Sequence, residues 1–252
     1  MTQDLFRTDA TLRECSATVA ALPSGGIVLD RSVFYPLGGG QAGDTGELVL
    51  ADGRAIQIAD TRKLKDAEGR PTADIVHVPA PGQEDLLAAL GLGSAVTARI
   101  DWVRRHRLMR FHTTTHLLCH LVPHLVNGCS ITPDYARLDF SMTEPLDKEF
   151  LTAGIAALVT AALPVTVGAI SDDELDANPA LVKSMSVQPP RGTGQIRTIR
   201  IGHSTPGGGQ PSIDFQPCGG THVANTSEIG AVVVTKIEKK SATTRRIVLG
   251  FA

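Results

Sequence analysis

Two pairs of metal-binding side chains stand out in this 252-residue sequence. His112 and His116 are four residues apart, and Cys218 and His222 repeat that spacing far downstream. On a helix, side chains four residues apart lie on one face about 5–6 Å from each other, so two imidazoles can reach one ion. The second pair encloses two glycines, which suit a tight turn that brings both ligands to one side. Three imidazoles and a thiolate favour zinc over magnesium or calcium.

Other histidines nearby compete for the role of ligand. His112, His116, His120 and His124 recur every four residues. One ion cannot take both His112 and His120, because two helical turns separate them by about 12 Å. Apolar residues surround His120, and Pro123 disturbs the helix before His124. His112 and His116 are therefore the predicted ligands, and two ordinary helix histidines are the alternative.

The residues around the predicted ligands narrow the chemistry. Metalloproteases with this histidine spacing carry Glu after the first His as general base, whereas this chain has Thr113, so a peptidase would lack its base. Four protein ligands would close the zinc shell, as in structural sites, and a catalytic role requires one weak or displaceable ligand. The hydroxyl groups of Thr113, Thr114, Thr115 and Thr221 can orient water or substrate, although Thr is also common at helix starts. Thr115 is the candidate catalytic hydroxyl.

A glycine-rich segment is the second candidate for contact with a ligand. Gly38, Gly39 and Gly40 precede Gln41, which supplies both a hydrogen-bond donor and an acceptor. Consecutive glycines let the backbone come close to a ligand, so these glycines are candidate substrate-binding residues. The segment lacks the Gly-Lys-Ser/Thr ending of a P-loop and the strand–helix context of a dinucleotide fingerprint. A flexible turn is the alternative.

The distribution of charge bears on nucleic-acid binding. The formal net charge of -2 argues against indiscriminate binding to nucleic acids. Basic residues nevertheless gather before the first histidine pair and near the C-terminus, where they form either solvated faces or contacts to phosphates. The first group comprises Arg104, Arg105, Arg107 and Arg110, of which the first three are candidate substrate-binding residues that would contact phosphates. The second group comprises Lys236, Lys239, Lys240, Arg245 and Arg246.

The sequence predicts a cytoplasmic protein with no membrane association. No stretch approaches the roughly 20 apolar residues of a membrane span. The polar N-terminus, Met-Thr-Gln-Asp, has no presequence character. The four cysteines are scattered, which fits a reducing compartment better than a disulfide framework.

The hydrophobic pattern changes near residue 100. Before it, strands are expected at 26–30, 32–35, 74–78 and 95–100, with a hairpin over 46–58 and a short helix over 84–90. After it, helical spacing predicts helices over 104–121 and 146–163 and a short turn at 172–175, with strands at 135–140, 165–170 and 196–201 and a hairpin of 229–237 and 246–251. The predicted fold class is α+β. Residues 1–100 would form a small β-barrel and residues 101–252 a two-layer domain with helices on one face of an antiparallel sheet.

Four stretches together resemble the alanyl-tRNA editing proteins of the AlaX family, in their longer form with an N-terminal β-barrel, and the editing domain of alanyl-tRNA synthetases. The stretches follow the family's order and run from about residue 27 to the end of the chain. They are residues 29–36 (Leu-Asp-Arg-Ser-Val-Phe-Tyr-Pro) with 38–41 and 44–46, residues 109–118 (Met-Arg-Phe-His-Thr-Thr-Thr-His-Leu-Leu), residues 196–201, and residues 216–222 (Gln-Pro-Cys-Gly-Gly-Thr-His).

The resemblance implies both a site and a reaction. It implies one zinc ion per chain, held by His112, His116, Cys218 and His222, and a loop that brings Gln41 toward the pocket. The implied reaction is hydrolysis of the ester bond in tRNA(Ala) mischarged with serine or glycine, acting in trans and in functional partnership with alanyl-tRNA synthetase. Such a second sieve is needed because a synthetase pocket cannot reject near-isosteric amino acids by binding alone.

The chain also departs from the family. Ser32 stands where Thr is usual, and Leu37 stands where an acidic or polar residue is usual. Ser32 and Gln41 are the candidate catalytic-site residues that would read the hydroxyl group of the amino acid. The loop over 203–213 is longer than usual, which would alter contacts with tRNA or synthetase. A tRNA-binding module with structural zinc and an unrelated zinc hydrolase remain the alternatives.

Overall fold

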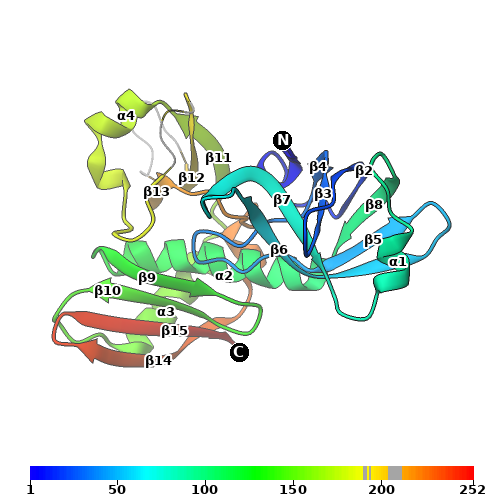
Figure 1. Ribbon diagram of the computed structural model, residues 1–252. Helices are drawn as coiled ribbons and strands as arrows, with labels where there is room; N and C mark the ends of the chain where they lie inside the picture. The colour runs from blue at the N-terminus through cyan, green and yellow to red at the C-terminus, as the bar shows by residue number, and fades with distance from the viewer. Residues whose placement is uncertain (190–191, 193, 204–211) are drawn as a thin grey trace. The chain divides into compact units, whose positions relative to one another are not determined.

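The computed structural model of the chain (Figure 1) describes residues 1–189, 192, 194–203 and 212–252. The chain divides into two compact units. The first comprises Met1–Gly38 and Ala42–His106, and the second comprises Gly39–Gln41 and Arg107–Ala252. The division falls inside one long helix, α2 (Trp102–Leu121). A separate domain that begins near residue 101 stays a prediction.

The first unit is built from a ring of strands. They hydrogen-bond in the order β2-β3-β7-β6-β5-β8, and β8 pairs with β2, so the ring closes. Its strands are β2 (Glu14–Ala21), β3 (Ile27–Leu29), β5 (Gly46–Leu50), β6 (Ala55–Lys65), β7 (Pro71–Pro79) and β8 (Ala95–Ile100). The unit also holds the parallel pair β1 (Gln3–Asp4) and β4 (Arg31–Ser32), the turn η1 (Leu5–Arg7) and the helix α1 (Glu84–Ala88).

Alternation along the strands fills the inside of this ring. In β8 the buried positions are Val96, Ala98 and Ile100, every second residue, as expected for a strand with one face on a core. Leu48 and Ile56 from neighbouring strands are fully buried in the same cluster. The inward faces thus form the larger hydrophobic core of the first unit, beside a smaller cluster of Phe6, Tyr35 and Ile75.

The second unit contains two antiparallel sheets, visible as separate groups of arrows in Figure 1. A four-stranded sheet has the order β14-β15-β10-β9, and a three-stranded sheet has the order β11-β12-β13. The strands are β9 (Val126–Ile131), β10 (Ala136–Ser141), β11 (Val165–Ile170), β12 (Ile196–Ile201), β13 (Asp214–Pro217), β14 (Val232–Ser241) and β15 (Thr244–Phe251). The helical segments are α3 (Lys148–Thr160), α4 (Asp172–Ala177), η2 (Pro179–Leu181) and η3 (Thr226–Ile229).

Helices α2 and α3 pack together and against the four-stranded sheet. The ring of Phe111 in α2 lies 4.1 Å, centroid to centroid, from that of Phe251 in β15. In α3, the hydroxyl of Thr152 accepts a hydrogen bond from the backbone N–H of Val234 in β14 at 3.2 Å. A Cβ atom at Gly154 would come within 3.0 Å of the Leu121 side chain, so α2 and α3 touch closely there. The core behind the sheet therefore holds the histidine helix in place.

The coarse prediction of a mixed α/β fold is confirmed. Among the described residues, more lie in strands than in helices, and there are four α-helices. Strands β8, β11 and β12 have the predicted bounds, and the hairpin turn at Asp52-Gly53 joins β5 to β6 with Gly53 at φ 86°. Strands β1, β2, β9 and β13 were missing from the prediction, and the expected strand at 32–35 is wrong beyond residue 32, where β4 ends. Within the described part of the chain, no helix is long and apolar enough to cross a membrane.

Candidate metal centre

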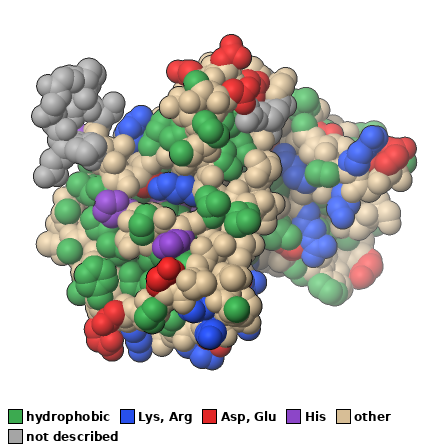
Figure 2. Space-filling model, turned by 90° about the vertical axis from the view of Figure 1, so that its left-hand side faces the viewer, with side chains coloured by type: hydrophobic (Ala, Val, Ile, Leu, Met, Phe, Trp, Pro, Cys, Tyr) green, Lys and Arg blue, Asp and Glu red, His purple; other side chains and the backbone are tan. Residues whose placement is uncertain are grey.

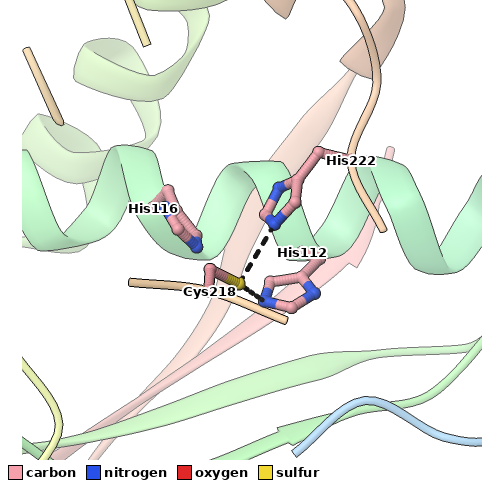
Figure 3. Close-up of side chains that lie close together, drawn as sticks. All are labelled: His112, His116, Cys218 and His222. Atoms are coloured by element: carbon pink, nitrogen blue, oxygen red, sulfur yellow. Dashed lines mark hydrogen bonds between the residues drawn. The ribbon is translucent and has the colours of Figure 1, made fainter. Parts of the chain in front are cut away.

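Four side chains from two distant segments converge in the second unit. His112 and His116 project from α2 toward Cys218 and His222, which lie in the segment after β13 (Figure 3). One donor atom from each of the four lies within 4.8 Å of the others. The three imidazole rings are 4.3 to 5.5 Å apart, centroid to centroid. The structure thus brings together the two pairs that the spacing predicted, whereas His120 is exposed on α2 and lies outside the cluster.

The cluster fits a tetrahedral zinc ion. Zinc bonds of about 2.0 Å to nitrogen and 2.3 Å to sulfur, at tetrahedral angles, place the two donors about 3.5 Å apart. The Sγ atom of Cys218 lies 3.5 Å from Nε2 of His112 and 3.3 Å from Nε2 of His222. The three histidines are also buried, which keeps competing water away. Both the type and the spacing of the donors therefore suit zinc.

His112 is oriented by Gln41. Its Nδ1 lies 2.7 Å from the Oε1 atom of Gln41, a carbonyl-type oxygen that can only accept, so Nδ1 carries the proton and Nε2 faces the cluster. The same oxygen accepts from the backbone N–H of Thr221 at 3.1 Å, and the amide nitrogen donates to the Thr221 hydroxyl at 2.9 Å. Gln41 is fully buried, with both ends of its amide bonded to protein. The structure favours a positioning role for Gln41 over contact with substrate.

His116 is oriented by a buried carboxylate. Nδ1 of His116 lies 2.7 Å from Oδ2 of Asp214, and the other oxygen of Asp214 pairs with the ammonium group of Lys183. Burial opposes charge on both partners. Nevertheless, the bonds of His116 to Asp214 and Cys218 raise the pKa of His116 to about 9, and those of Asp214 to His116 and Lys183 lower the pKa of Asp214 to about 2. The result is a carboxylate–histidine pair of the kind that supports metal ligands.

His222 and Cys218 complete the set. The Nδ1 atom of His222 lies 3.2 Å from the hydroxyl of Thr113, which also accepts from the backbone N–H of Val223 at 3.3 Å. Burial and the neighbouring His112 lower the pKa of His222 to about 3, so the ring is neutral and able to ligate. Burial alone would raise the pKa of the Cys218 thiol, but His112 and His222 hold it well below its ordinary value. Cys218 is therefore available as the thiolate that zinc binds.

The turn that carries Cys218 and His222 is shaped by glycine and by an arginine. A Cβ atom at Gly220 would lie 2.1 Å from the His112 ring, so only glycine fits at this position. The Nη1 group of Arg197 in β12 donates to the backbone carbonyls of Cys218 at 2.7 Å and Gly220 at 3.0 Å. The turn is thereby fixed to its neighbouring strand.

The glycine-rich segment approaches protein rather than open space. The carbonyl of Gly40 accepts from the backbone N–H of Ile131 in β9 at 2.7 Å, and a Cβ atom at Gly40 would come within 2.9 Å of Cys129 Sγ. Gly39 and Gly40 have φ values of 58° and 84°, which favour glycine. Gly38 belongs to the first unit, where its carbonyl accepts from the Tyr35 hydroxyl at 2.8 Å. A substrate-binding role for these glycines stays a prediction.

The two predicted catalytic hydroxyls already have protein partners. Thr115 donates to the carbonyl of His112 one turn back along α2, at 2.7 Å, so this bond gives no support to a catalytic role. Ser32 is fully buried in the first unit, where its Oγ lies 2.8 Å from Nε2 of His77 and accepts from the backbone N–H of Phe34 at 3.0 Å. Both catalytic assignments stay predictions.

The structure corrects one of the predicted phosphate contacts. Arg105 is fully buried in the first unit and forms an ion pair with Asp44, and it also donates to two backbone carbonyls. Its charge is therefore balanced inside the protein and is not presented to a phosphate. Arg104 and Arg107 are half-buried, so the burial that excludes Arg105 does not apply to them. The sequence showed a run of arginines but not the distant carboxylate that one of them meets.

Sequence reasoning missed the residues that hold the ligands from behind. Asp214, Gln216 and Thr113 lie against the cluster, and Gln216 donates to Asp214 at 3.0 Å. One signal was present. Residues 214, 216 and 218 share one face if the segment before Cys218 is a strand. The strand was not predicted because β13 has only 4 residues and ends in proline.

Comparison with known proteins identifies the class of protein to which this fold and metal cluster belong. Residues 196–248 match the family described as "Threonyl and Alanyl tRNA synthetase second additional domain". This segment contains β12, β13, β14 and nearly all of β15, together with Cys218 and His222. Residues 196–248 of the second unit are therefore similar to a domain that occurs in threonyl- and alanyl-tRNA synthetases.

Relatives of similar length specify the family further. The chain is 30% identical to the alanyl-tRNA editing protein AlaX-M of Saccharolobus solfataricus, over 98% of each protein. It is 32% identical to the AlaX-M protein of Methanosarcina barkeri, again over 98% of each. The alanine–tRNA ligase of Metallosphaera sedula is 33% identical over 94% of this chain, which spans 25% of that ligase. The chain belongs to the alanyl-tRNA editing protein family of the AlaX-M type.

Proposed function

We propose that this protein is a zinc-dependent hydrolase that removes serine, and also glycine, from mischarged tRNA(Ala). The observation that carries the proposal is the cluster of His112, His116, Cys218 and His222, found in a chain that belongs to a family named for alanyl-tRNA editing. The ester between amino acid and tRNA is the bond that breaks, with water as the other reactant. The products are free amino acid and tRNA that can be charged again.

The protein's own residues would prepare the site for this hydrolysis. A bound zinc ion supplies Lewis acidity, which lowers the barrier for attack on an ester carbonyl. Gln41, Asp214 and Thr113 hold the three imidazoles with Nε2 toward the cluster, so the rings are already oriented for the ion, and His116 gives up its Nε2 proton when the ion binds. Burial of the histidines keeps bulk water out. Ser32 is the proposed reader of the seryl hydroxyl.

A second function has one observation in its favour. Four protein donors can fill a tetrahedral shell, which is typical of structural zinc. In that case the protein would bind tRNA(Ala) without cleaving the ester. The two functions differ in a single outcome, the release of amino acid by catalytic amounts of protein.

A deacylation assay tests the proposal. tRNA(Ala) charged with serine, glycine or alanine is mixed with protein at a small fraction of the tRNA concentration, and the released amino acid is measured over time. We expect turnover with serine and glycine and little with alanine. Release that stops at one amino acid per protein, or no release at all, would reject the enzymatic function. Protein treated with a chelator is the matched control.

The same proposal extends to setting and architecture. We propose that the protein works in the cytoplasm beside alanyl-tRNA synthetase, which produces its substrate. We further propose that the six-stranded ring of the first unit is the small β-barrel of the longer AlaX form, and that residues 101–252 are the editing domain. The single antiparallel sheet expected there is instead two sheets, and α2 and α3 pack against the four-stranded one. The expected long loop at 203–213 lies mostly outside the described residues.

A further inference from the structure

Two arginines on one face of α2 carry charge that no carboxylate among the described residues balances. Arg107 and Arg110 are three residues apart, which places them on the same helical face. Their guanidinium carbons lie 4.4 and 4.1 Å from the centroid of the Phe251 ring in β15. Across the residues that the structure describes, neither guanidinium has a carboxylate within ion-pair distance. We call Arg107 and Arg110 the arginine pair.

The hydrogen bonds of the arginine pair leave its outer nitrogens unused. The Nε of Arg107 donates to the carbonyl of Pro133 at 2.6 Å, and the Nε of Arg110 donates to the carbonyl of Ile229 at 2.6 Å. Neither terminal Nη group has an acceptor in the described part of the protein. A guanidinium carries five N–H donors, so both arginines are anchored at Nε and keep their outer edge for a ligand.

Other arginines of the protein are used differently. Arg105 bonds to protein acceptors through all three of its nitrogens. Arg246 forms a two-point bond to the carboxylate of Asp139, at 2.6 and 2.8 Å. In both cases a carboxylate neutralises the charge. The arginine pair lacks this neutralisation although its two charges lie close together.

The surroundings of the arginine pair hold it ready for an anion. Burial and, to a smaller extent, the nearby charge of Arg107 lower the pKa of Arg110, which reflects the cost of holding this charge partly buried beside a like charge. A bound anion would offset that cost. Gly230 has φ 64°, and a Cβ atom there would come within 3.0 Å of Nη2 of Arg110. Glycine therefore leaves room beside the guanidinium.

We propose that the arginine pair, stacked on Phe251, binds a phosphate of the tRNA backbone. The proposal rests on the tRNA substrate proposed above. A planar guanidinium binds phosphate oxygens with two parallel N–H···O bonds, and stacking on a ring fixes its direction beforehand. Figure 2 shows one face, on which Lys and Arg side chains lie in small groups among hydrophobic and polar ones. The formal net charge of -2 favours contact at defined points over attraction to a broad basic field.

Salt dependence of binding tests the proposal. The logarithm of the binding constant falls linearly with the logarithm of the salt concentration. Each phosphate that the protein neutralises adds roughly 0.7 to 0.9 to the steepness of this line. The affinity of uncharged tRNA(Ala) is measured between roughly 50 and 200 mM salt. For the double variant Arg107→Met/Arg110→Met we expect weaker binding and a slope that is smaller by about 1 to 2. For Arg107→Lys/Arg110→Lys we expect most of the slope to remain, since the charges remain.

The control removes two charges that are already paired. Arg54 and Arg70 are exposed at hairpin turns and form ion pairs with Asp52 and Asp66, at 2.7 and 2.8 Å. Arg54→Met/Arg70→Met changes the net charge by the same amount as the Met variant of the arginine pair. We expect the parent's slope from this control. If the control variant loses as much salt slope as the Met variant of the arginine pair, the effect comes from net charge alone and the proposal is overturned.

The thermal midpoint separates binding from a merely structural role. Loss of stacking on Phe251 should lower the midpoint in both the Met and the Lys variants, whereas only the Met variant should lose the salt slope. A lower midpoint with the parent's slope in the Met variant would mean that the arginine pair only holds Phe251. Deacylation by the parent is scored separately. Serine release with an unchanged slope rejects the phosphate site alone, and a changed slope without serine release rejects the enzymatic function alone.

Discussion

The three histidines of the metal cluster differ in the group that holds the nitrogen facing away from the cluster. His112 meets an amide oxygen, His116 a carboxylate and His222 a hydroxyl. A carboxylate makes an imidazole a stronger donor than an amide or a hydroxyl does. The support is therefore graded, with His116 held most strongly and His222, at 3.2 Å from a hydroxyl, held least.

Gln41→Leu tests the support of His112. Leucine fills similar space but offers no oxygen to Nδ1 and leaves the Thr221 N–H without its acceptor. Loss of such a partner typically reduces metal affinity by about 10- to 100-fold. Competition with a chelator of known affinity measures the loss. Gln57→Leu, at an exposed position of β6, is the control and should keep the parent's affinity. Equal zinc affinity in the two variants would contradict the positioning role.

Gly220→Ala tests the close packing of the ligand turn. The added methyl group would lie 2.1 Å from the His112 ring, so the ring or the turn has to move. We expect zinc affinity to fall at least 10-fold, as for loss of a supporting partner. Gly91→Ala is matched in chemistry, because its Cβ would meet only the Ser94 hydroxyl, at 3.9 Å. A Gly220→Ala protein with normal zinc affinity would show that the turn is adaptable.

Ser32→Ala tests both stability and amino-acid selectivity. Nδ1 of His77 faces the carbonyl of Ile27 at 3.0 Å, so Nδ1 carries the proton and the Ser32 hydroxyl donates to Nε2. Removal of the hydroxyl leaves a buried nitrogen unpaired, which costs about 1–3 kcal/mol of the free energy of unfolding. If Ser32 also reads the substrate, the ratio of seryl to alanyl deacylation rates should fall, with zinc content unchanged. Ser32→Thr, which keeps the hydroxyl, should preserve that ratio.

Among the helices and strands, sequence patterns predicted those whose formation depends on residues nearby in the chain. The strand β8 was found because its apolar residues alternate, and α3 because Phe150, Leu151 and Ile155 recur at helical spacing before Pro164. The strand β2 was missed because its alternating residues include small and polar ones. The bond between Gln41 and Thr221 joins residues 180 apart, and no local pattern predicts it. The ligands could thus be inferred, but their supports could not.

The burial of His77 in strand β7 predicts how the stability of the fold depends on acid pH. Burial lowers the pKa of His77 to about 4, so the ring is neutral in the fold. The unfolded chain, with an ordinary histidine pKa near 6.5, takes up a proton first as pH falls. This contribution to stability is present above pH 6.5 and is lost progressively down to about pH 4, by about 2 kcal/mol between pH 7 and pH 5.

Urea unfolding of the parent and of His77→Gln at both pH values isolates this contribution. The variant should lose less stability on acidification than the parent, because glutamine does not titrate. His120→Gln is the control, since His120 is exposed on α2, and it should behave like the parent. Identical pH dependence in the parent and His77→Gln would rule out the buried neutral ring as a source of acid lability.

For the whole molecule, zinc should act as a cross-link between distant parts of the chain. An ion that binds only the folded state stabilises it by an amount that grows with the logarithm of its concentration over its dissociation constant. A chelator should therefore lower the thermal midpoint of the parent. Cys218→Ala should start at a lower midpoint, contain less zinc and respond little to the chelator. Cys119→Ala removes a buried thiol outside the cluster and should keep both zinc and the response.

The route of the chain through the site has a consequence for its synthesis. Gln41 leaves the ribosome long before His112 and His116, and the last two ligands follow only at residues 218 and 222 of 252. Until then, the emerging chain exposes two histidines that can hold an ion only loosely. Because closing such long loops costs chain entropy, the complete set of donors forms late. Newly made protein should thus acquire its metal only after residue 222 has been made, because the set of donors is incomplete before then.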